Sequence, residues 1–515
     1  GEPVIISCTG ATASRNYAPG LTEAYYRKLP ILVVTSSQFF GRVGHHMPQV
    51  TDRTNPMNDM VRKSVQIPIA HTEEERWSNN VKINDALLEL RRNGGGPVHI
   101  NIETSFSKIF DVKELPKTRV IRRINSWDNF PKINANKIAI FVGSHSVFSQ
   151  ELTEEIDLFC KHNNAVVLCD HTSNYKGRYR VQGGIVERQA GYIPECTRPD
   201  LLIHIGEVSG AYYQMKNLPA WRVNPDGEIR DTFKKLQYVF EMPEILFFKR
   251  LNKETKIIVQ NTYLNEWQEE ERKLFDRLPD LSFSNAWIGQ QTAPRLPDNS
   301  EIHFGILNSL RMWNLFNIPS SVYGYSNVGG FGIDGSISTV LGASLANKKK
   351  IYFLVLGDLA TFYDLNALGN RHFGNNVRIL VINNGTGFEM RHKTNRGDVF
   401  KEDANILFAA GGHFGNQSRV LLKHIANDLG FEYISAENKE EYTANVGRFV
   451  TKKMTDKPLI FEVFLNIADE YNDFEATQYI IQDTSTAAKN TVKNLLGEKG
   501  VQTLKGIKSS ILGKK

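Results

Sequence analysis

The stretch from Gly357 to Asn384, GDLATFYDLNALGNRHFGNNVRILVINN, places the strongest constraint on how this 515-residue chain folds. It starts at the end of one apolar run, Ile351–Leu356, and closes on a second, Val377–Ile382. Both runs are short, rich in β-branched residues and bounded by Gly or Asn, which is typical of buried parallel strands. Between them, Phe362–Phe373 has the length and composition of a crossover helix. We therefore predict a βαβ unit within an open α/β sheet.

Polar side chains stand at the carboxyl ends of both predicted strands. Asp358 follows the first strand and Asn383-Asn384 closes the second, at the edge where open α/β sheets bind ligands. One carboxylate with amide and main-chain oxygens is a hard oxygen set, suited to Mg²⁺ that keeps positions open for phosphate oxygens. Taken singly, Asp358 reads as a helix cap and the Asn pair as a strand end. Their joint spacing favours the magnesium site.

The run resembles the diphosphate-binding motif of thiamin diphosphate (ThDP) enzymes, which begins Gly-Asp-Gly and ends Asn-Asn. Leu359 at the third position, followed by YDLNAL, is similar to the SEPHCHC (2-succinyl-5-enolpyruvyl-6-hydroxy-3-cyclohexene-1-carboxylate) synthase family, which joins 2-oxoglutarate to isochorismate. Three further stretches resemble that family: Thr9–Pro30, Val223–Asp231 and Asn327–Thr339. The resemblance implies an α/β fold of three doubly wound parallel-sheet domains, with ThDP and Mg²⁺ as cofactors.

Alternation of apolar runs with helical stretches predicts where these domains lie. We expect a pyrimidine-binding domain over residues 1–125 that lacks its first strands, a central domain over 126–275, a diphosphate-binding domain over 276–470 and a C-terminal extension over 471–515. The strands expected in the first two are Val4–Ser7, Ile31–Thr35, Val98–Ile102, Ile138–Val142, Ala165–Leu168, Leu201–Ile205 and Trp221–Val223, and the helices expected along the chain include Asn79–Arg92, Asn265–Leu278 and Ser336–Asn347.

Composition bounds the class of protein. An apolar content of 41% and a charged content of 23% describe an ordinary globular protein. The chain has no run of 18 apolar residues and no secretion signal at its start, and its four cysteines (Cys8, Cys160, Cys169 and Cys196) lack metal-type spacing and read as reduced thiols. We therefore expect a cytoplasmic protein. A net charge of +6 suits anionic small molecules and does not demand nucleic acid.

The tail from Asp483 to Lys515 is rich in lysine and has apolar residues near helical spacing. A basic amphipathic helix of this kind can lie on an anionic membrane surface. The alternative, a partly ordered tail that packs on the body of the protein or on a partner, is favoured.

The resemblance assigns the cofactor site residue by residue. Asp358, Asn384 and the carbonyl of Thr386 would hold the metal. Ile333 would wedge under the bent cofactor, although by its chemistry alone it reads as a core residue. Backbone N–H groups at the start of the helix after Gly335 are a ready anion site. The full cofactor-binding set is Gly332, Ile333, Asp334, Gly335, Ser336, Gly357, Asp358, Leu359, Asn384, Thr386 and Gly387.

ThDP chemistry also needs a carboxylate that activates the aminopyrimidine. The resemblance places this glutamate upstream of Val4–Thr12, before the sequence begins, and neither Glu2 nor Glu23 matches its position. We expect either a fragment that lacks the first strands of its first domain or a chain that has lost cofactor activation; a start without Met favours the fragment.

The substrate pocket departs from the family pattern. Two positions where the family carries carboxylate-binding arginines hold Val328 and Trp313, with Arg311 two residues earlier, and an apolar pair becomes Glu389 and Met390. Glu389 either acts as an acid or base or faces solvent. We assign substrate contact to Ser309, Arg311, Trp313, Val328 and Met390, and catalytic roles to Glu389, Gln49, His45 and His46, the last two either as proton shuttles or as plain surface.

These residues predict a ThDP- and Mg²⁺-dependent decarboxylase and carboligase with an altered pocket. It would take a 2-oxo acid donor, with pyruvate preferred over 2-oxoglutarate, and a carbonyl or enoyl acceptor; a role in sugar or surface-polysaccharide synthesis is the pathway we suggest. Two alternatives remain: a genuine SEPHCHC synthase of menaquinone biosynthesis, and a catalytically silent ThDP-binding subunit. The resemblance further implies a homodimer or homotetramer, because one chain completes the site of another.

Overall fold

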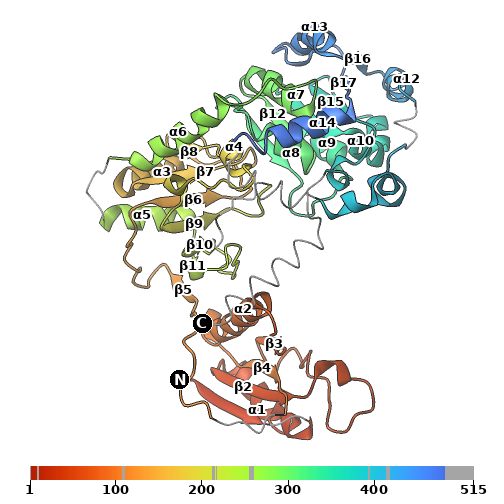
Figure 1. The fold of residues 1–515 in the computed structure, drawn as a ribbon. Helices are drawn as coiled ribbons and strands as arrows, with labels where there is room; N and C mark the ends of the chain where they lie inside the picture. Colours follow the sequence, from red (N-terminus) through yellow and green to blue (C-terminus); the bar gives the residue numbers. More distant parts are fainter. Residues whose placement is uncertain are drawn as a thin grey trace, which may run out of the picture. The chain divides into compact units, whose positions relative to one another are not determined.

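The computed structural model describes residues 2–8, 11–106, 111–210, 215, 217–254, 260–392, 395–412 and 418–481. The chain divides into two compact units, and Figure 1 labels their elements. The first unit comprises Gly1–Asn134, Leu201–Ile203 and Met215–Phe247. The second comprises Ala135–Asp200, His204–Gln214 and Phe248–Lys515.

A four-stranded parallel sheet forms the start of the chain, drawn in red to orange in Figure 1. Its order is β1-β2-β4-β3. The strands are β1 Val4–Cys8, β2 Ile31–Ser37, β3 Lys63–Ile67 and β4 Val98–Glu103, accompanied by helices α1 Ala18–Tyr26 and α2 Glu73–Glu89. Helix α2 begins where a capping box sets it: the Thr72 side chain accepts from the Glu75 N–H, and the Glu75 carboxylate accepts from the Thr72 N–H.

The second sheet has seven strands in the order β5-β11-β10-β9-β6-β7-β8. Every residue of β6, β7 and β9 is buried, as expected for parallel strands covered on both faces. The strands are β5 Arg122–Asn125, β6 Ile138–Val142, β7 Ala165–Leu168, β8 Arg180–Val181, β9 Leu201–Ile205, β10 Ala220–Val223 and β11 Leu236–Glu241; the helices are α3 Gln150–Asn163, α4 Gly184–Glu187, α5 Glu244–Glu254 and α6 Thr262–Phe275.

The third sheet has six parallel strands in the order β13-β12-β14-β15-β17-β16. The strands are β12 Glu301–Phe304, β13 Tyr323–Ser326, β14 Tyr352–Gly357, β15 Val377–Asn383, β16 Glu432–Ala436 and β17 Leu459–Phe464. The helices are α7 Asn285–Thr292, α8 Asn308–Trp313, α9 Ser336–Ala346, α10 Asp358–Tyr363, α12 Leu421–Asp428, α13 Lys439–Phe449 and α14 Ile467–Ala476.

Helices cover both faces of this third sheet. Tyr352, Leu354 and Leu356 of β14 pack in one cluster with side chains of α9 and α12. Phe353 lies between them in sequence and contacts Phe449 of α13, with ring centroids 5.2 Å apart. Because successive side chains of a strand point to opposite faces, α13 lies on the face opposite α9 and α12. The sheet is doubly wound, as the sequence predicts.

Three mainly parallel sheets with interleaved helices confirm the predicted α/β class. Several elements, such as Ile138–Val142, Ala165–Leu168 and Leu201–Ile205, have the predicted bounds. The predicted crossover helix Phe362–Phe373 is wrong: the structure has the short helix α10, which starts at Asp358, and then a 3₁₀ helix over Leu365–Gly369. The polar run after Gly369 lacks the apolar periodicity that would bury a longer helix.

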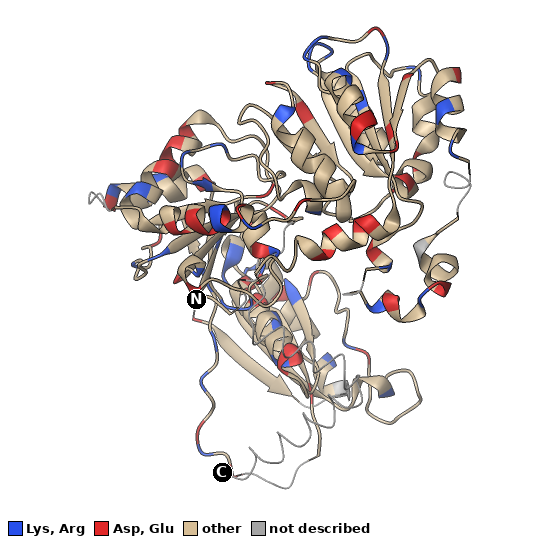
Figure 2. Ribbon diagram, turned by 45° about the horizontal axis from the view of Figure 1, so that its top comes forward, with Lys and Arg blue, Asp and Glu red and all other residues tan. Residues whose placement is uncertain are grey.

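The distribution of surface charge and the state of the cysteines agree with what the composition predicts. Acidic and basic residues lie interspersed along the helices drawn in Figure 2. The four cysteines are free thiols, and burial raises the pKa of Cys160 and of Cys169. Within the described part of the chain, no helix is long and apolar enough to cross a membrane.

Several sequence-based expectations stay predictions. The domain boundaries, the cytoplasmic location and the lack of nucleic-acid binding are not decided by the fold. The tail Asp483–Lys515 and the start of Thr9–Pro30 lie outside the described residues.

Candidate functional site

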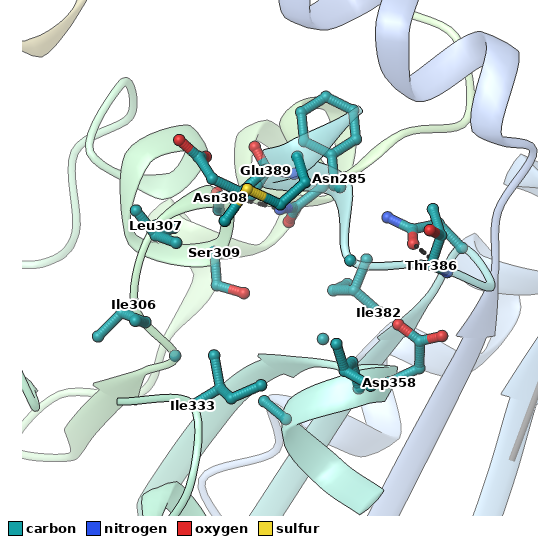
Figure 3. Close-up of a pocket in the computed structure, with 18 of the residues that line it drawn as sticks. Asn285, Ile306, Leu307, Asn308, Ser309, Ile333, Asp358, Ile382, Thr386 and Glu389 are labelled. Atoms are coloured by element: carbon teal, nitrogen blue, oxygen red, sulfur yellow. Dashed lines mark hydrogen bonds between the residues drawn. The ribbon is translucent and has the colours of Figure 1, made fainter. Parts of the chain in front are cut away.

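A cavity of about 200 Å³ opens where three neighbouring strands of the third sheet end (Figure 3). Chain segments that follow β12, β14 and β15 supply most of its wall. The lining residues are Asn285, Gly305, Ile306, Leu307, Asn308, Ser309, Ile333, Gly357, Asp358, Leu359, Ala360, Ile382, Asn384, Thr386, Gly387, Phe388, Glu389, Met390 and Phe408. This is the strand edge at which open α/β sheets bind ligands.

Asp358 and the turn after β15 meet on one side of the cavity. The Asp358 side chain is only 1% exposed, and its Oδ2 accepts a hydrogen bond from the Gly385 N–H at 3.1 Å. Gly385 has φ of 81°, a conformation that suits glycine, and the Thr386 N–H donates to Asn384 Oδ1 at 3.3 Å. The carboxylate therefore holds the turn that carries the other two predicted metal ligands.

The glycine-rich segment before α9 supplies an apolar contact to the cavity. Ile333 lines the wall and also packs against the buried core of the third sheet, so its two predicted readings, wedge and core residue, are compatible. Gly335 caps α9 with φ of 84°. Its neighbours Gly332, Asp334 and Ser336 do not line the cavity but flank the segment that does.

Asp364 secures the first turn of α9. Its carboxylate accepts both the backbone N–H and the hydroxyl of Ser338, each at 2.7 Å. An acid at a helix N-terminus satisfies otherwise unpaired N–H groups and favours the helix dipole. The helix start is thus fixed by a side chain from the segment that follows α10.

We expect Asp364→Ala to lower the free energy of unfolding by about 1 kcal/mol, within a range of roughly 0.5–2 kcal/mol for lost caps. Urea denaturation of the purified protein measures this change. Asp364→Asn keeps one acceptor oxygen and should lose less. Equal stability of wild type and Asp364→Ala would contradict the capping role.

Glu389 and Arg311 form an ion pair at the cavity wall. Arg311 Nη1 lies 2.8 Å from Glu389 Oε2, and His392 Nε2 lies 3.5 Å from Glu389 Oε1. Burial alone would raise the pKa of Glu389, but the His392 hydrogen bond and the Arg311 charge outweigh it and lower that pKa to about 2. Glu389 is therefore ionised at neutral pH, and it pairs with Arg311 at the cavity wall instead of simply facing solvent. Its role as an acid or base stays a prediction.

A second arginine stands behind this pair. Arg188, at the end of α4, lies over the Phe474 ring at 4.1 Å, and Arg311 lies over the same ring at 5.8 Å. Arg188 donates to the Phe474 carbonyl and the Thr477 hydroxyl. Burial and the nearby Arg311 charge lower the pKa of Arg188. The Phe474 ring of α14 therefore makes cation–π contacts with both Arg188 and Arg311.

Glu470 of α14 is buried beside three asparagines of the cavity wall. Its carboxylate accepts from the Asn285 backbone N–H and from the side-chain amides of Asn308 and Asn384, the latter two at 3.4 and 3.5 Å. Burial raises the pKa of Glu470 to about 7. Among the described residues, Asn308 Oδ1 is buried without a hydrogen-bond partner.

The structure brings together half of the residues that the sequence predicts for the site. Ten of them line the one cavity: Ser309, Ile333, Gly357, Asp358, Leu359, Asn384, Thr386, Gly387, Glu389 and Met390. Arg311, Trp313 and Val328 do not line it, and the last two are buried. The Trp313 indole N–H donates to Asn285 Oδ1 at 3.1 Å, so it supports the wall from behind. Direct substrate contact by Trp313 or Val328 stays a prediction that this geometry does not favour.

His45, His46 and Gln49 lie in the first compact unit, on an exposed turn between β2 and β3. His46 and Gln49 have positive φ angles of 54° and 63°. Their catalytic roles stay predictions.

Sequence reasoning assigned no role to two residues of the wall, Asn285 and Asn308, or to Glu470, which contacts both from behind the wall. No local pattern marks Asn285 or Glu470 as part of a site. Leu307, which lines the cavity, has a φ of 61°, a strained backbone conformation for a bulky residue. Strained residues of this kind cluster at functional sites, but the sequence does not reveal the strain.

The donor set fits a magnesium-bound diphosphate. A deeply buried carboxylate such as Asp358 is stable where it is paired or binds a metal. In the described residues, no three His, Cys, Asp or Glu side chains gather as a metal site. The predicted set has one carboxylate with amide and carbonyl oxygens, which is the kind that leaves Mg²⁺ positions for phosphate.

Comparisons with known proteins point to one enzyme family. Over 496 residues the chain is 30% identical to the 2-succinyl-5-enolpyruvyl-6-hydroxy-3-cyclohexene-1-carboxylate synthase of Bacteroides fragilis, covering 90% of this chain and 85% of that protein. The proteins of the same name from Bacteroides thetaiotaomicron and Flavobacterium psychrophilum are 29% and 26% identical, each over 90% of this chain and over 85% and 84% of their own lengths. No family model matches the chain.

Proposed function

The chain belongs to the SEPHCHC synthase family of ThDP-dependent enzymes, and we propose that it decarboxylates a 2-oxo acid and joins the remaining acyl unit to an acceptor. The observation that carries this proposal is that Asp358, Asn384 and Thr386 line one cavity together with Ile333. Figure 3 labels Asp358, Thr386 and Ile333 around that cavity. When bound, ThDP supplies the nucleophilic carbon and the electron sink for this chemistry. The acceptor would be a carbonyl or enoyl compound.

The chain's own residues would bind and orient these groups. Asp358, Asn384 and Thr386 would hold Mg²⁺ against the diphosphate, and Ile333 with Ile382 would give the cavity an apolar floor that excludes water. Ser309 points its hydroxyl into the cavity, where it can donate to a substrate oxygen (Figure 3). Water exclusion strengthens each of these polar contacts.

The donor follows from the Glu389–Arg311 pair. To bind the second carboxylate of a donor such as 2-oxoglutarate, Arg311 would have to break its ion pair with Glu389. The negative charge of Glu389 would also repel that carboxylate. We therefore propose a monocarboxylic donor such as pyruvate. The alternative, a genuine SEPHCHC synthase that takes 2-oxoglutarate and isochorismate, is supported by the names of the relatives and by the additional positive charge of Arg188. The polysaccharide pathway stays a prediction.

A direct test is release of CO₂ by purified full-length protein with pyruvate or 2-oxoglutarate. Release that requires both ThDP and Mg²⁺ would support the proposed activity. ThDP binding without CO₂ from either donor, with or without isochorismate as acceptor, would support the silent-subunit alternative. Absence of ThDP binding would overturn both.

We also propose that the protein is a homodimer or a dimer of dimers. Three large apolar side chains that are close in sequence are exposed: Val399 is 74%, Ile406 86% and Leu407 63% exposed. The next residue, Phe408, lines the cavity. Exposed apolar patches of this kind mark interaction sites, and cyclic dimers are the commonest solution.

We expect light scattering at micromolar concentration to give at least twice the 58.4 kDa chain mass, and Ile406→Glu to shift the protein toward monomer. Burying a charge in an apolar interface without a partner is costly. Leu429→Glu, at an exposed position after α12, is the matched control and should leave the mass unchanged. A wild-type monomer would count against this assembly.

A further inference from the structure

We propose that Glu470 is a positioning residue for the site: it holds the amides of Asn384 and Asn308 so that their carbonyl oxygens are left for the metal and for a ligand. This inference rests on the proposed function, since it assumes that Asn384 binds Mg²⁺. Glu470 does not line the cavity and belongs to α14, outside the strand ends that form most of the wall.

The geometry brings three separate segments onto one carboxylate. Oε1 accepts the backbone N–H of Asn285, at the start of α7. Oε2 accepts from Asn308 Nδ2 at 3.4 Å and from Asn384 Nδ2 at 3.5 Å. Asn285, Asn308 and Asn384 all line the cavity. Glu470 is 3% exposed, so no bulk water competes for these donors.

The chemistry of an amide explains why this matters. An asparagine side chain has one oxygen acceptor and one NH₂ donor, and fixing the NH₂ on a carboxylate turns the oxygen the other way. Asn384 Oδ1 then remains on the side of Thr386, where the predicted ligands gather. Asn308 lines the cavity, and its Oδ1 is buried and has no hydrogen-bond partner among the described residues. A buried acceptor of this kind suits an N–H or O–H group of a ligand.

Glutamine at position 470 should disturb this arrangement without changing its shape. A carboxylate offers two acceptor oxygens, whereas glutamine offers one oxygen and one NH₂. Asn285 would take the oxygen, and the new NH₂ would face the NH₂ groups of Asn308 and Asn384. At least one of these amides would then turn, presenting a donor where an oxygen is needed.

The test is calorimetric titration of Mg²⁺ into the full-length apoprotein with saturating ThDP. Groups that orient metal ligands typically contribute 10–100-fold to metal affinity. We expect Glu470→Gln to weaken Mg²⁺ binding by about that factor. Glu271→Gln is the matched control, because Glu271 is half-buried and also accepts a backbone N–H, from Gly183, away from the cavity.

A double-mutant cycle separates positioning from a general structural effect. If Glu470 acts through Asn384, Glu470→Gln should weaken Mg²⁺ binding little further in an Asn384→Ala background, because interacting residues are non-additive. Titrations to about 10 mM Mg²⁺ keep weakened variants measurable. Circular dichroism confirms that each variant is folded.

The outcomes distinguish the two proposals. No Mg²⁺-dependent ThDP binding by the wild type would overturn the proposed function. Normal wild-type binding with an unchanged affinity in Glu470→Gln would overturn the positioning role alone. An equal loss in the wild-type and Asn384→Ala backgrounds, or an equal loss in Glu271→Gln, would also overturn it.

Discussion

Asp358→Ala should abolish Mg²⁺-dependent ThDP binding, with a loss of affinity of at least about 100-fold, or roughly 2.7 kcal/mol. Two physical effects act in the same direction. Asp358 is the one formal negative charge in the predicted metal set. Its carboxylate also holds the Gly385 N–H and thereby the turn that carries Asn384 and Thr386. Removing it therefore takes away one ligand and loosens the other two.

Asp358→Asn separates these effects. The amide oxygen can still accept from Gly385, but the charge is lost, so we expect an affinity between those of wild type and Asp358→Ala. Isothermal titration calorimetry with ThDP and Mg²⁺ measures all three proteins. If Asp358→Ala bound both with unchanged affinity, the cofactor site would have to lie elsewhere.

The second large effect concerns the donor. We expect the wild type to decarboxylate pyruvate at least about tenfold more efficiently than 2-oxoglutarate, because the extra carboxylate loses its water and meets the Glu389 charge. Glu389→Gln should remove this repulsion and free the Arg311 fork for bidentate binding. The ratio of kcat/KM for 2-oxoglutarate to that for pyruvate should then rise by about tenfold, or ~1.4 kcal/mol.

A neighbouring ion pair provides the control for this experiment. Glu402 contacts Arg391 at 3.3 Å, and its side chain is well exposed, so Glu402→Gln should leave donor selectivity unchanged. The measurement is single-turnover decarboxylation with each donor. A clear preference of the wild type for 2-oxoglutarate would contradict the altered pocket and favour the genuine SEPHCHC synthase.

The structure changes which residue should be substituted to alter the donor selectivity. The sequence suggests that arginine at position 328 would restore carboxylate binding if that position opened onto the cofactor. Val328 is instead buried and does not line the cavity. An arginine there would bury a charge, whereas Glu389 already stands on the wall beside Arg311. Glu389 is therefore the better position to change.

The sequence by itself determined the class of fold and one side of the site. Strands β14 and β15 were predictable because strands buried on both faces are continuous apolar runs. Asp358 and Asn384 were predictable because they follow those strands directly, and parallel strands bring their carboxyl ends to one edge. The span Phe362–Phe373 was mispredicted because its composition permits a helix that the packing does not continue.

Only the tertiary structure decided how the wall is completed. Glu470 meets residues 86, 162 and 185 positions away along the chain, and Arg311 meets Glu389 across 78 positions. Such contacts leave no periodicity or local spacing in the sequence, because each partner belongs to a different element. These contacts exist because helices α7, α8 and α14 pack together behind the strand ends. That packing determines which side chains contact the buried carboxylate of Glu470.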